Sequence, residues 1–210
     1  MYLPTHFEET DLQALHEGIS QSPFGTLVTL SDTGLEANHL PFELDAAQGT
    51  HGVLRCHVSR ANAVWKTIAA SSEALVIFQG PSTYISPSLY ASKPDTHQTV
   101  PTYNYVAIHA HGRVVIHDDT RWLHGLVGRL TRRYENVRDE PWKMSDAPPA
   151  YIEERLQQIV GLEIIVSRIE GKWKMSQNRE ERDQRSVIAG LTDSPDAADR
   201  AVAAEMQRRR

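Results

Sequence analysis

The segment Ser59-Arg60-Ala61-Asn62 carries residue types that bind phosphate, and it stands between an apolar run and a helical pattern. Backbone N–H groups at a helix start are unpaired and attract anions, and a guanidinium adds a planar pair of donors that matches phosphate oxygens. Ser59 or Asn62 could bind a further anion oxygen or cap the helix. The segment therefore indicates a phosphate site, although capping residues are the norm at helix starts and, from these residues alone, an ordinary cap is favoured.

A second polar segment runs from Lys172 to Arg179. On a strand, Lys172 and Lys174 would share one face, and Gln177 and Asn178 would follow the strand. Glutamine and asparagine each supply a donor and an acceptor, so this cluster could bind the polar edge of a heteroaromatic ring. A loop start beside a solvated pair of lysines explains the same residues equally well.

Histidines are the third candidate, because the chain has 10 of them. His109 and His111 are two residues apart on one predicted strand, and two imidazoles at that spacing can reach one metal ion. The sequence places no carboxylate or cysteine at a spacing that completes the set, so we predict no metal site. A polar face at an interface is the simpler interpretation, and haem ligation by His39, His109 or His111 is a minor alternative.

Motifs for covalent catalysis and for nucleotide binding are missing from the sequence. It has no Gly-x-Ser-x-Gly elbow, no Walker A loop and no Gly-x-Gly-x-x-Gly fingerprint. Cys56 lies inside an apolar strand pattern, where a packed thiol is expected. No helix-turn-helix pair is visible, and the basic runs 129–138 and 208–210 are typical of solvated helix faces. We therefore predict no catalytic residue and see no DNA-binding element.

Composition places the chain among soluble globular proteins. It has 210 residues, 40% of them hydrophobic and 23% charged, with a formal net charge of -5. The acidic balance argues against nonspecific nucleic-acid binding. One cysteine cannot form an internal disulfide and suits a reducing cytoplasm, and no signal peptide or membrane-spanning run is seen. We expect a cytoplasmic protein.

The hydrophobic pattern predicts several short antiparallel strands with inserted helices. We expect strands at residues 24–30, 35–44, 53–58, 75–78, 84–86, 101–117, 162–169 and 172–176, with breaks at Gly80-Pro81 and at Glu170-Gly171. We expect helices at 8–20, from 62 through 70, and at 120–134, 149–158 and 196–209. This order favours an α+β fold, a small barrel with helical flanks, over a doubly wound sheet.

The alternating segment from Val100 to His117 has two unlike faces, because strand side chains alternate. One face is apolar and fits a core; it carries Val106, Ile108 and Ala110. The other is aromatic and polar, as a partner subunit or a flat ligand would require; it carries Tyr103, Tyr105, His109 and His111.

Several short motifs follow one another along the chain. They are Met1-Tyr2 with Pro4 and Phe7, His39-Leu40-Pro41-Phe42, Arg60-Ala61-Asn62 with Trp65, Phe78-Gln79-Gly80-Pro81, Tyr84-Ile85-Ser86-Pro87, Val100-Pro101-Thr102-Tyr103-Asn104-Tyr105, Ile159-Val160-Gly161 and Lys172-Trp173-Lys174-Met175-Ser176-Gln177-Asn178. Taken in this order, they resemble the PaiB-like family, whose members are FMN-binding negative transcriptional regulators. The resemblance covers residues 1 to about 191, and only Tyr103 departs mildly, at a position where tryptophan is expected.

The resemblance implies an antiparallel split β-barrel similar to pyridoxamine-phosphate oxidases and flavin reductases. It also implies a homodimer with FMN in a groove between subunits, and a phosphate site at Ser59 to Asn62. We expect one domain, 1–191, followed by a helical tail, 192–210. The residues expected to bind FMN are Ser59, Arg60, Asn62, His39, Tyr103, Lys174, Gln177 and Asn178.

The function implied by the resemblance is that of an FMN-binding negative transcriptional regulator. Two alternatives stay open: a flavin-dependent oxidoreductase or flavin reductase, for which FMN would supply the chemistry, and a haem-binding or haem-degrading split-barrel protein. Repression of transcription is implied only by the resemblance, because the residues show no recognition helix. Replacing Arg60 with alanine should weaken FMN binding and leave the fold intact.

Overall fold

The computed structural model describes residues 1–68 and 73–209. Its strands are β1 (Glu8–Glu9), β2 (Phe24–Ser31), β3 (Gly34–Pro41), β4 (Glu43–Asp45), β5 (Val53–Ser59), β6 (Glu73–Ile85), β7 (Thr102–His117) and β8 (Ile159–Lys174). Its α-helices are α1 (Leu12–Gln21), α2 (Val64–Thr67), α3 (Lys93–Thr96), α4 (Thr120–Glu135), α5 (Pro149–Leu156), α6 (Glu181–Thr192) and α7 (Ala197–Arg208). Short 3-10 turns occur at Thr5–Phe7, Pro87–Leu89 and Met144–Asp146.

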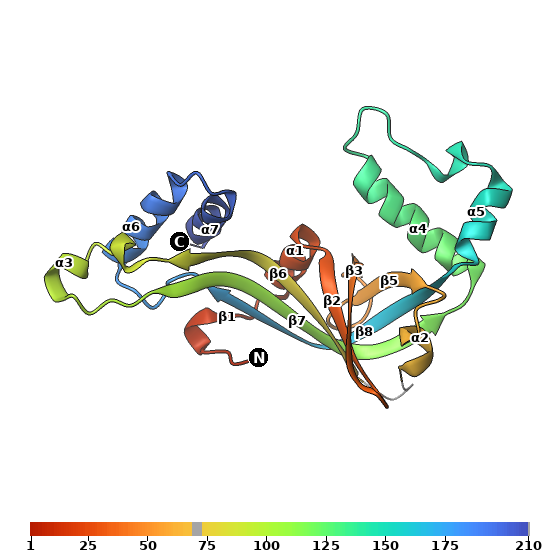
Figure 1. Ribbon diagram of the computed structural model, residues 1–210, viewed down its shortest axis with the longest axis horizontal. Coiled ribbons are helices and arrows are strands. Elements are labelled where there is room, and N and C mark those ends of the chain that lie inside the picture. The colour runs from red at the N-terminus through yellow and green to blue at the C-terminus, as the bar shows by residue number, and fades with distance from the viewer. Residues whose placement is uncertain (69–72, 210) are drawn as a thin grey trace. The chain divides into compact units, whose positions relative to one another are not determined.

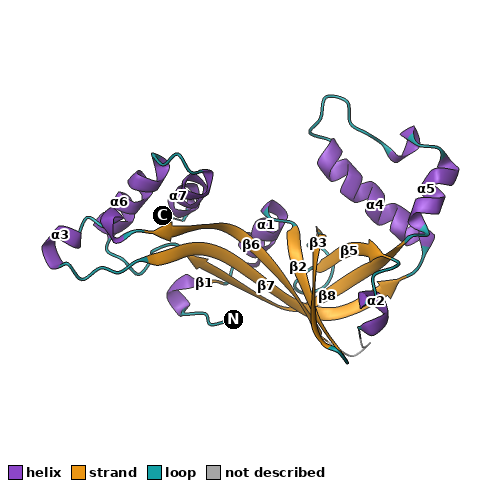
Figure 2. Ribbon diagram, viewed as in Figure 1, coloured by secondary structure: helices purple, strands orange, loops and turns teal. Residues whose placement is uncertain are grey.

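The strands form one sheet in the order β3-β2-β6-β7-β8-β5-β4, with β1 beside β8 (Figures 1 and 2). The pairs β2–β3, β2–β6, β4–β5, β5–β8 and β1–β8 are antiparallel. The mainly antiparallel α+β fold is therefore confirmed. The sheet has two ends, β3 and β4, so the strands described do not close on themselves as a complete small barrel would.

The chain divides into two compact units. One consists of residues 1–22, 79–109 and 170–210, and we call it the α1/α7 unit. The other consists of residues 23–78 and 110–169, and we call it the α4/α5 unit. The strands β6, β7 and β8 contribute residues to both units. The predicted boundary after residue 191 falls near the end of α6, and α7 is part of the α1/α7 unit.

The alternation predicted for the long strand β7 is present. Val106, Ile108 and Ala110 are 5%, 1% and 0% exposed, whereas Tyr103 on the other face is 57% exposed. In the α4/α5 unit, Phe42 packs edge-on against Phe78 with ring centroids 5.5 Å apart. Apolar side chains on one face of each strand therefore build the core.

Several predicted boundaries were wrong. Strand β6 runs through Gly80-Pro81 and β8 runs through Glu170-Gly171, so each is one strand where two were expected. The first helix begins at Leu12, after Asp11, whose side chain caps it, and not at residue 8 as expected. The last helix begins at Ala197, after Asp196, whose side chain caps it, and not at residue 196 as expected. The α6 helix was not predicted at all.

The helix predicted from 62 through 70 is a single turn, α2, within the described residues; the expected end at Ala70 lies outside them. None of the helices in residues 1–68 and 73–209 combines the length and apolar character needed to span a membrane.

Gly161 on β8 is a position where the fold requires the smallest residue. An added Cβ would lie 2.1 Å from Cζ3 of Trp122, whose ring stacks on His117 with centroids 4.1 Å apart. Because the added methyl group would force Trp122 to move, Gly161→Ala should lower the free energy of unfolding by about 2 kcal/mol, measured by urea denaturation.

Gly128→Ala in α4 is the matched control. Its added Cβ would meet nothing closer than Sδ of Met144 at 3.5 Å. Alanine favours a helix over glycine, so this variant should be neutral or slightly more stable than the wild type. Equal losses in the two variants would contradict the packing argument.

Candidate functional site

The turn between β5 and α2 holds the predicted phosphate residues. The N–H of Asn62 donates to the carbonyl of Ser59 over 2.9 Å, and the N–H of Ala61 donates to Ser59 Oγ over 3.3 Å. The Asn62 amide caps the next turn, since its Oδ1 accepts from the N–H of Val64 at 2.9 Å, and its Nδ2 donates to Asn38 at 2.7 Å. Ser59 is exposed and its O–H group can still donate to a ligand.

Arg60 is held by the protein itself. Its Nη1 and Nη2 donate to the two carboxylate oxygens of Asp118 at 2.9 and 2.5 Å, and its Nε donates to the carbonyl of Gln157 at 2.6 Å. The hydrogen bond from Arg60 lowers the pKa of Asp118, and the same bond raises the pKa of Arg60. A phosphate would therefore have to displace the Asp118 carboxylate from Arg60 or bind the guanidinium together with it.

The short α2 helix also changes the phosphate argument. It spans only Val64–Thr67, and one turn of helix cannot develop a useful dipole. The expected contribution of a helix start is therefore lost, and an anion at this turn would depend on side chains and local N–H groups.

A cavity of about 580 Å³ lies beside this turn in the α4/α5 unit. Ser59 and Asn62 line it, Arg60 does not, and Arg155 contributes a guanidinium. Its lining residues are Leu40, Pro41, His57, Val58, Ser59, Asn62, Val127, Trp142, Met144, Ile152, Arg155, Leu156, Gln158 and Ile159. Hydrophobic walls with a few polar groups are typical of a cofactor pocket.

His57 is one of the polar residues of this cavity that the sequence did not predict as a ligand. Its Nδ1 is buried without a hydrogen-bond partner in the described structure, and burial lowers the pKa of the imidazole. A buried polar atom without a partner is costly, so a bound group would be favoured if it displaced the atoms that cover Nδ1 and bonded it. The strand pattern gives only a partial signal, because His57 and Arg55 are both polar residues within Val53–Val58.

His39 lies in the same unit on β3, and it is exposed. Its Nδ1 is 3.0 Å from Oγ1 of Thr26 on the paired strand β2. The preceding residue, Asn38, accepts a hydrogen bond from Asn62. His39 is therefore adjacent in sequence to a residue that orients the turn.

The other predicted cofactor residues belong to the α1/α7 unit. Lys174 Nζ donates to the carbonyl of Tyr103 at 2.7 Å and also contacts Oγ1 of Thr102. Burial, followed by the charges of Lys172 and Arg179, lowers the pKa of Lys174. Tyr103 packs edge-on against Tyr84, with centroids 5.9 Å apart.

Both polar atoms of the Gln177 side chain form hydrogen bonds within its own turn. Its Oε1 accepts from the N–H of Met175 at 2.6 Å, and its Nε2 donates to the carbonyl of Trp173 at 2.5 Å. Asn178 is exposed. The structure thus gathers Ser59, Arg60, Asn62 and His39 in one unit and Tyr103, Lys174, Gln177 and Asn178 in the other. Their cofactor roles remain predictions.

Comparison with known proteins identifies the relatives of this chain. Residues 1–168 match the family model described as "Putative FMN-binding domain". The protease synthase and sporulation protein PAI 2 of Bacillus subtilis is 34% identical over 191 residues, covering 91% of this chain and 89% of the relative. The resemblance inferred from the sequence motifs is therefore confirmed, and the family is described as FMN-binding.

Solved structures confirm the fold. The FAD and heme binding protein from Mycobacterium smegmatis matches with a TM-score of 0.60 at 14% identity, covering 87% of this chain and 80% of that one. The flavocytochrome Anf3 from Azotobacter vinelandii matches with a TM-score of 0.58 at 11% identity, covering 85% and 75%. At these identities the likeness establishes the split-barrel fold alone.

Proposed function

This chain belongs to the "Putative FMN-binding domain" family, and from that premise we propose that the protein binds FMN and acts as a negative regulator of transcription. The observation that carries the flavin part is the match over residues 1–168, which includes the β5–α2 turn and its cavity. The regulatory part is supported by the 34% identity to a Bacillus subtilis protein named for protease synthesis and sporulation.

The cavity beside the turn fits a flavin in its chemistry. Trp142, Met144 and Ile152 supply the kind of apolar wall against which a flat ring packs. Ser59 supplies a hydroxyl suited to phosphate, and a guanidinium is available from Arg60 on the turn beside the cavity or from Arg155 in its wall. When bound, FMN would supply redox chemistry, and the residues of this chain would bind and orient it and exclude water.

Dimer formation is part of the proposal. The hairpin of β2 and β3 exposes large apolar side chains at one end of the sheet: Phe24 is 66% exposed, Leu30 57% and Leu35 79%. An exposed apolar edge strand is a common contact surface between subunits. Light scattering after size exclusion should give twice the 23.6 kDa chain mass, whereas a monomer at micromolar concentration would contradict this part.

The direct test uses purified full-length protein. Its absorbance spectrum, and the compound released on denaturation, should show FMN near one equivalent per chain. The protein with FMN should retard a promoter fragment at low salt, because phosphate contacts are strongest there. Steady NADH or NADPH oxidation would favour a flavin reductase instead, and a Soret band that survives gel filtration would favour haem binding.

His57 offers a sharper test of the cavity. Asparagine can place a polar atom near the position of Nδ1, whereas glutamine places one nearer Nε2. We expect His57→Gln to weaken FMN binding about fivefold, the effect of one lost hydrogen bond of roughly 1 kcal/mol. His57→Asn should retain most of the affinity, as measured by fluorescence titration of FMN.

Thermal unfolding of both His57 variants provides the control, because both should melt near the wild-type temperature. Identical FMN affinities in the wild type and the two variants would show that Nδ1 does not contact the cofactor.

A further inference from the structure

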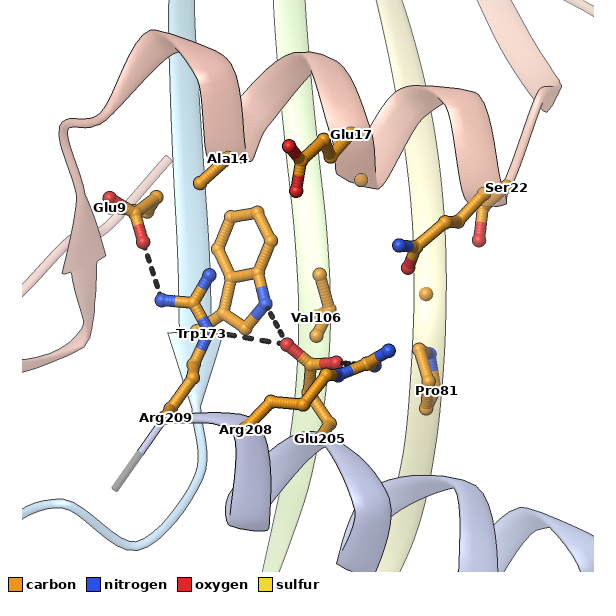
Figure 3. A pocket seen from close by; sticks show the side chains of 13 residues that line it. Glu9, Ala14, Glu17, Ser22, Pro81, Val106, Trp173, Glu205, Arg208 and Arg209 are labelled. Carbon is orange, nitrogen blue, oxygen red and sulfur yellow. Dashed lines mark hydrogen bonds and ion pairs between the residues drawn. The ribbon is translucent and has the colours of Figure 1, made fainter.

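A second cavity, of about 420 Å³, lies within the α1/α7 unit (Figure 3). Helix α1 forms one side and α7 the other, and the strands β6, β7 and β8 lie behind it. The lining residues are Glu9, Ala14, Glu17, Gly18, Gln21, Ser22, Gly80, Pro81, Val106, Trp173, Glu205, Arg208 and Arg209. We call this cavity the α1–α7 pocket.

The back of the α1–α7 pocket is apolar. Val106 and Pro81 stand on the strands, and the Trp173 indole flanks them (Figure 3). Gly18 allows α1 to approach, because a Cβ there would lie 2.6 Å from Cδ1 of Ile108 and 3.3 Å from the Trp173 ring. An aliphatic or aromatic body of a few carbon atoms would be well accommodated on this surface.

The rim is negatively charged overall. Glu9, Glu17 and Glu205 bring three carboxylates, against two guanidinium groups from Arg208 and Arg209. The helices α1 and α7 also end here, at Gln21 and Arg208, and helix C-termini attract cations. Glu17 reaches toward the open space (Figure 3). Its carboxylate accepts a hydrogen bond from the neutral amide of Gln13 at 2.9 Å.

One side chain of the protein, Arg209, already places a positive charge against the Trp173 indole. The Arg209 guanidinium lies 4.2 Å from the centroid of the Trp173 ring, bonds Glu205 at 3.2 Å and pairs with Glu9. Burial would raise the pKa of Glu9, but the hydrogen bond from Arg209 and backbone N–H groups outweigh it, and the pKa is lowered. An aromatic ring flanked by carboxylates is the environment that organic cations prefer. Arg209 thus shows that one end of the pocket binds a cationic group, and the open space lies beside Arg209.

We propose that the α1–α7 pocket binds a small organic cation, a protonated amine carried on an apolar body. The ammonium group would lie near Glu17, and the body would lie against Val106 and Pro81. Four lining residues, Trp173, Glu205, Arg208 and Arg209, follow residue 168, so the pocket uses a part of the chain that the family model does not match. The proposal is independent of flavin binding.

The test compares three probes of nearly the same shape on the full-length protein by isothermal titration calorimetry: benzylamine, benzyl alcohol and benzoate. Benzylamine should bind saturably, and the neutral and anionic probes should bind at least about fivefold more weakly, because they lack the positive charge. Glu17→Gln should weaken benzylamine binding about fivefold.

Two further variants make the test specific. Glu154→Gln removes an exposed carboxylate from α5 in the other unit and should leave benzylamine binding unchanged. Ala14→Leu adds bulk to the pocket wall and should reduce binding without removing a charge. Equal binding of all three probes, unchanged affinity in Glu17→Gln, or no saturable binding of benzylamine would each overturn the proposal, whether or not the protein binds FMN.

Discussion

Asp118→Asn should tighten FMN binding about tenfold, and Arg60→Ala should weaken it about tenfold. Arg60 is the residue that the family resemblance assigns to phosphate, yet its guanidinium is bonded to both carboxylate oxygens of Asp118. If phosphate binds there, it competes with that carboxylate, so a neutral asparagine frees the guanidinium for the ligand. Charge-assisted hydrogen bonds of this kind change binding constants by about tenfold or more.

The measurement is the dissociation constant of FMN for each variant, with riboflavin as the control ligand because it lacks the phosphate. Riboflavin affinity should be unchanged in both variants. If both substitutions weaken FMN and riboflavin alike, Arg60 holds the turn to Gln157 and Ile159 and does not contact phosphate. Arg155→Ala would then be the variant that loses affinity for FMN, since Arg155 lines the cavity.

Glu205→Ala should lower the free energy of unfolding by about 3 kcal/mol, which is the largest effect on stability that we expect from one side chain. Glu205 is 8% exposed and accepts a hydrogen bond from Nε1 of the buried Trp173 at 2.8 Å. Its loss leaves the indole N–H without this acceptor and removes the shared partner of Arg208 and Arg209. Breaking a buried pair costs about 3–5 kcal/mol, and the low end applies because both arginines reach solvent.

Urea denaturation of three variants separates the hydrogen bond from the charge. Glu205→Gln keeps an acceptor for Trp173 and should lose only about 1 kcal/mol. Glu154→Ala removes an exposed carboxylate that pairs with Arg155, and its effect should stay within about 0.5 kcal/mol. A Glu205→Ala protein as stable as Glu154→Ala would show that this network does not stabilise α7.

The sequence predicted most of the strands because their alternation is local, and it failed where tertiary pairing overrides local signals. Gly80-Pro81 looks like a break, yet β6 continues through it, and an added Cβ at Gly80 would lie 2.8 Å from Cβ of Val106. Glycine here permits close packing and does not mark a turn. Helix α6 was missed because its start, 180–185, is charged, and its buried apolar residues Val187, Ile188 and Leu191 come later.

The candidate site was predicted only in part. The polarity of Ser59 and Asn62 follows from residue type, and both line the cavity. The direction of a long side chain does not follow from residue type: Arg60 turns to Asp118, which is 58 residues away in the chain. Arg155 and Trp142 enter the cavity from distant segments, so only the folded chain could reveal them.

The strands β6, β7 and β8 contribute residues to both units, and this restricts how such a protein can be truncated or recombined. The α1/α7 unit is assembled from three separate stretches of chain and the α4/α5 unit from two. No single truncation therefore yields either half intact, and gene fusion could not transplant one half as a module. We conclude that the two units have to be engineered together.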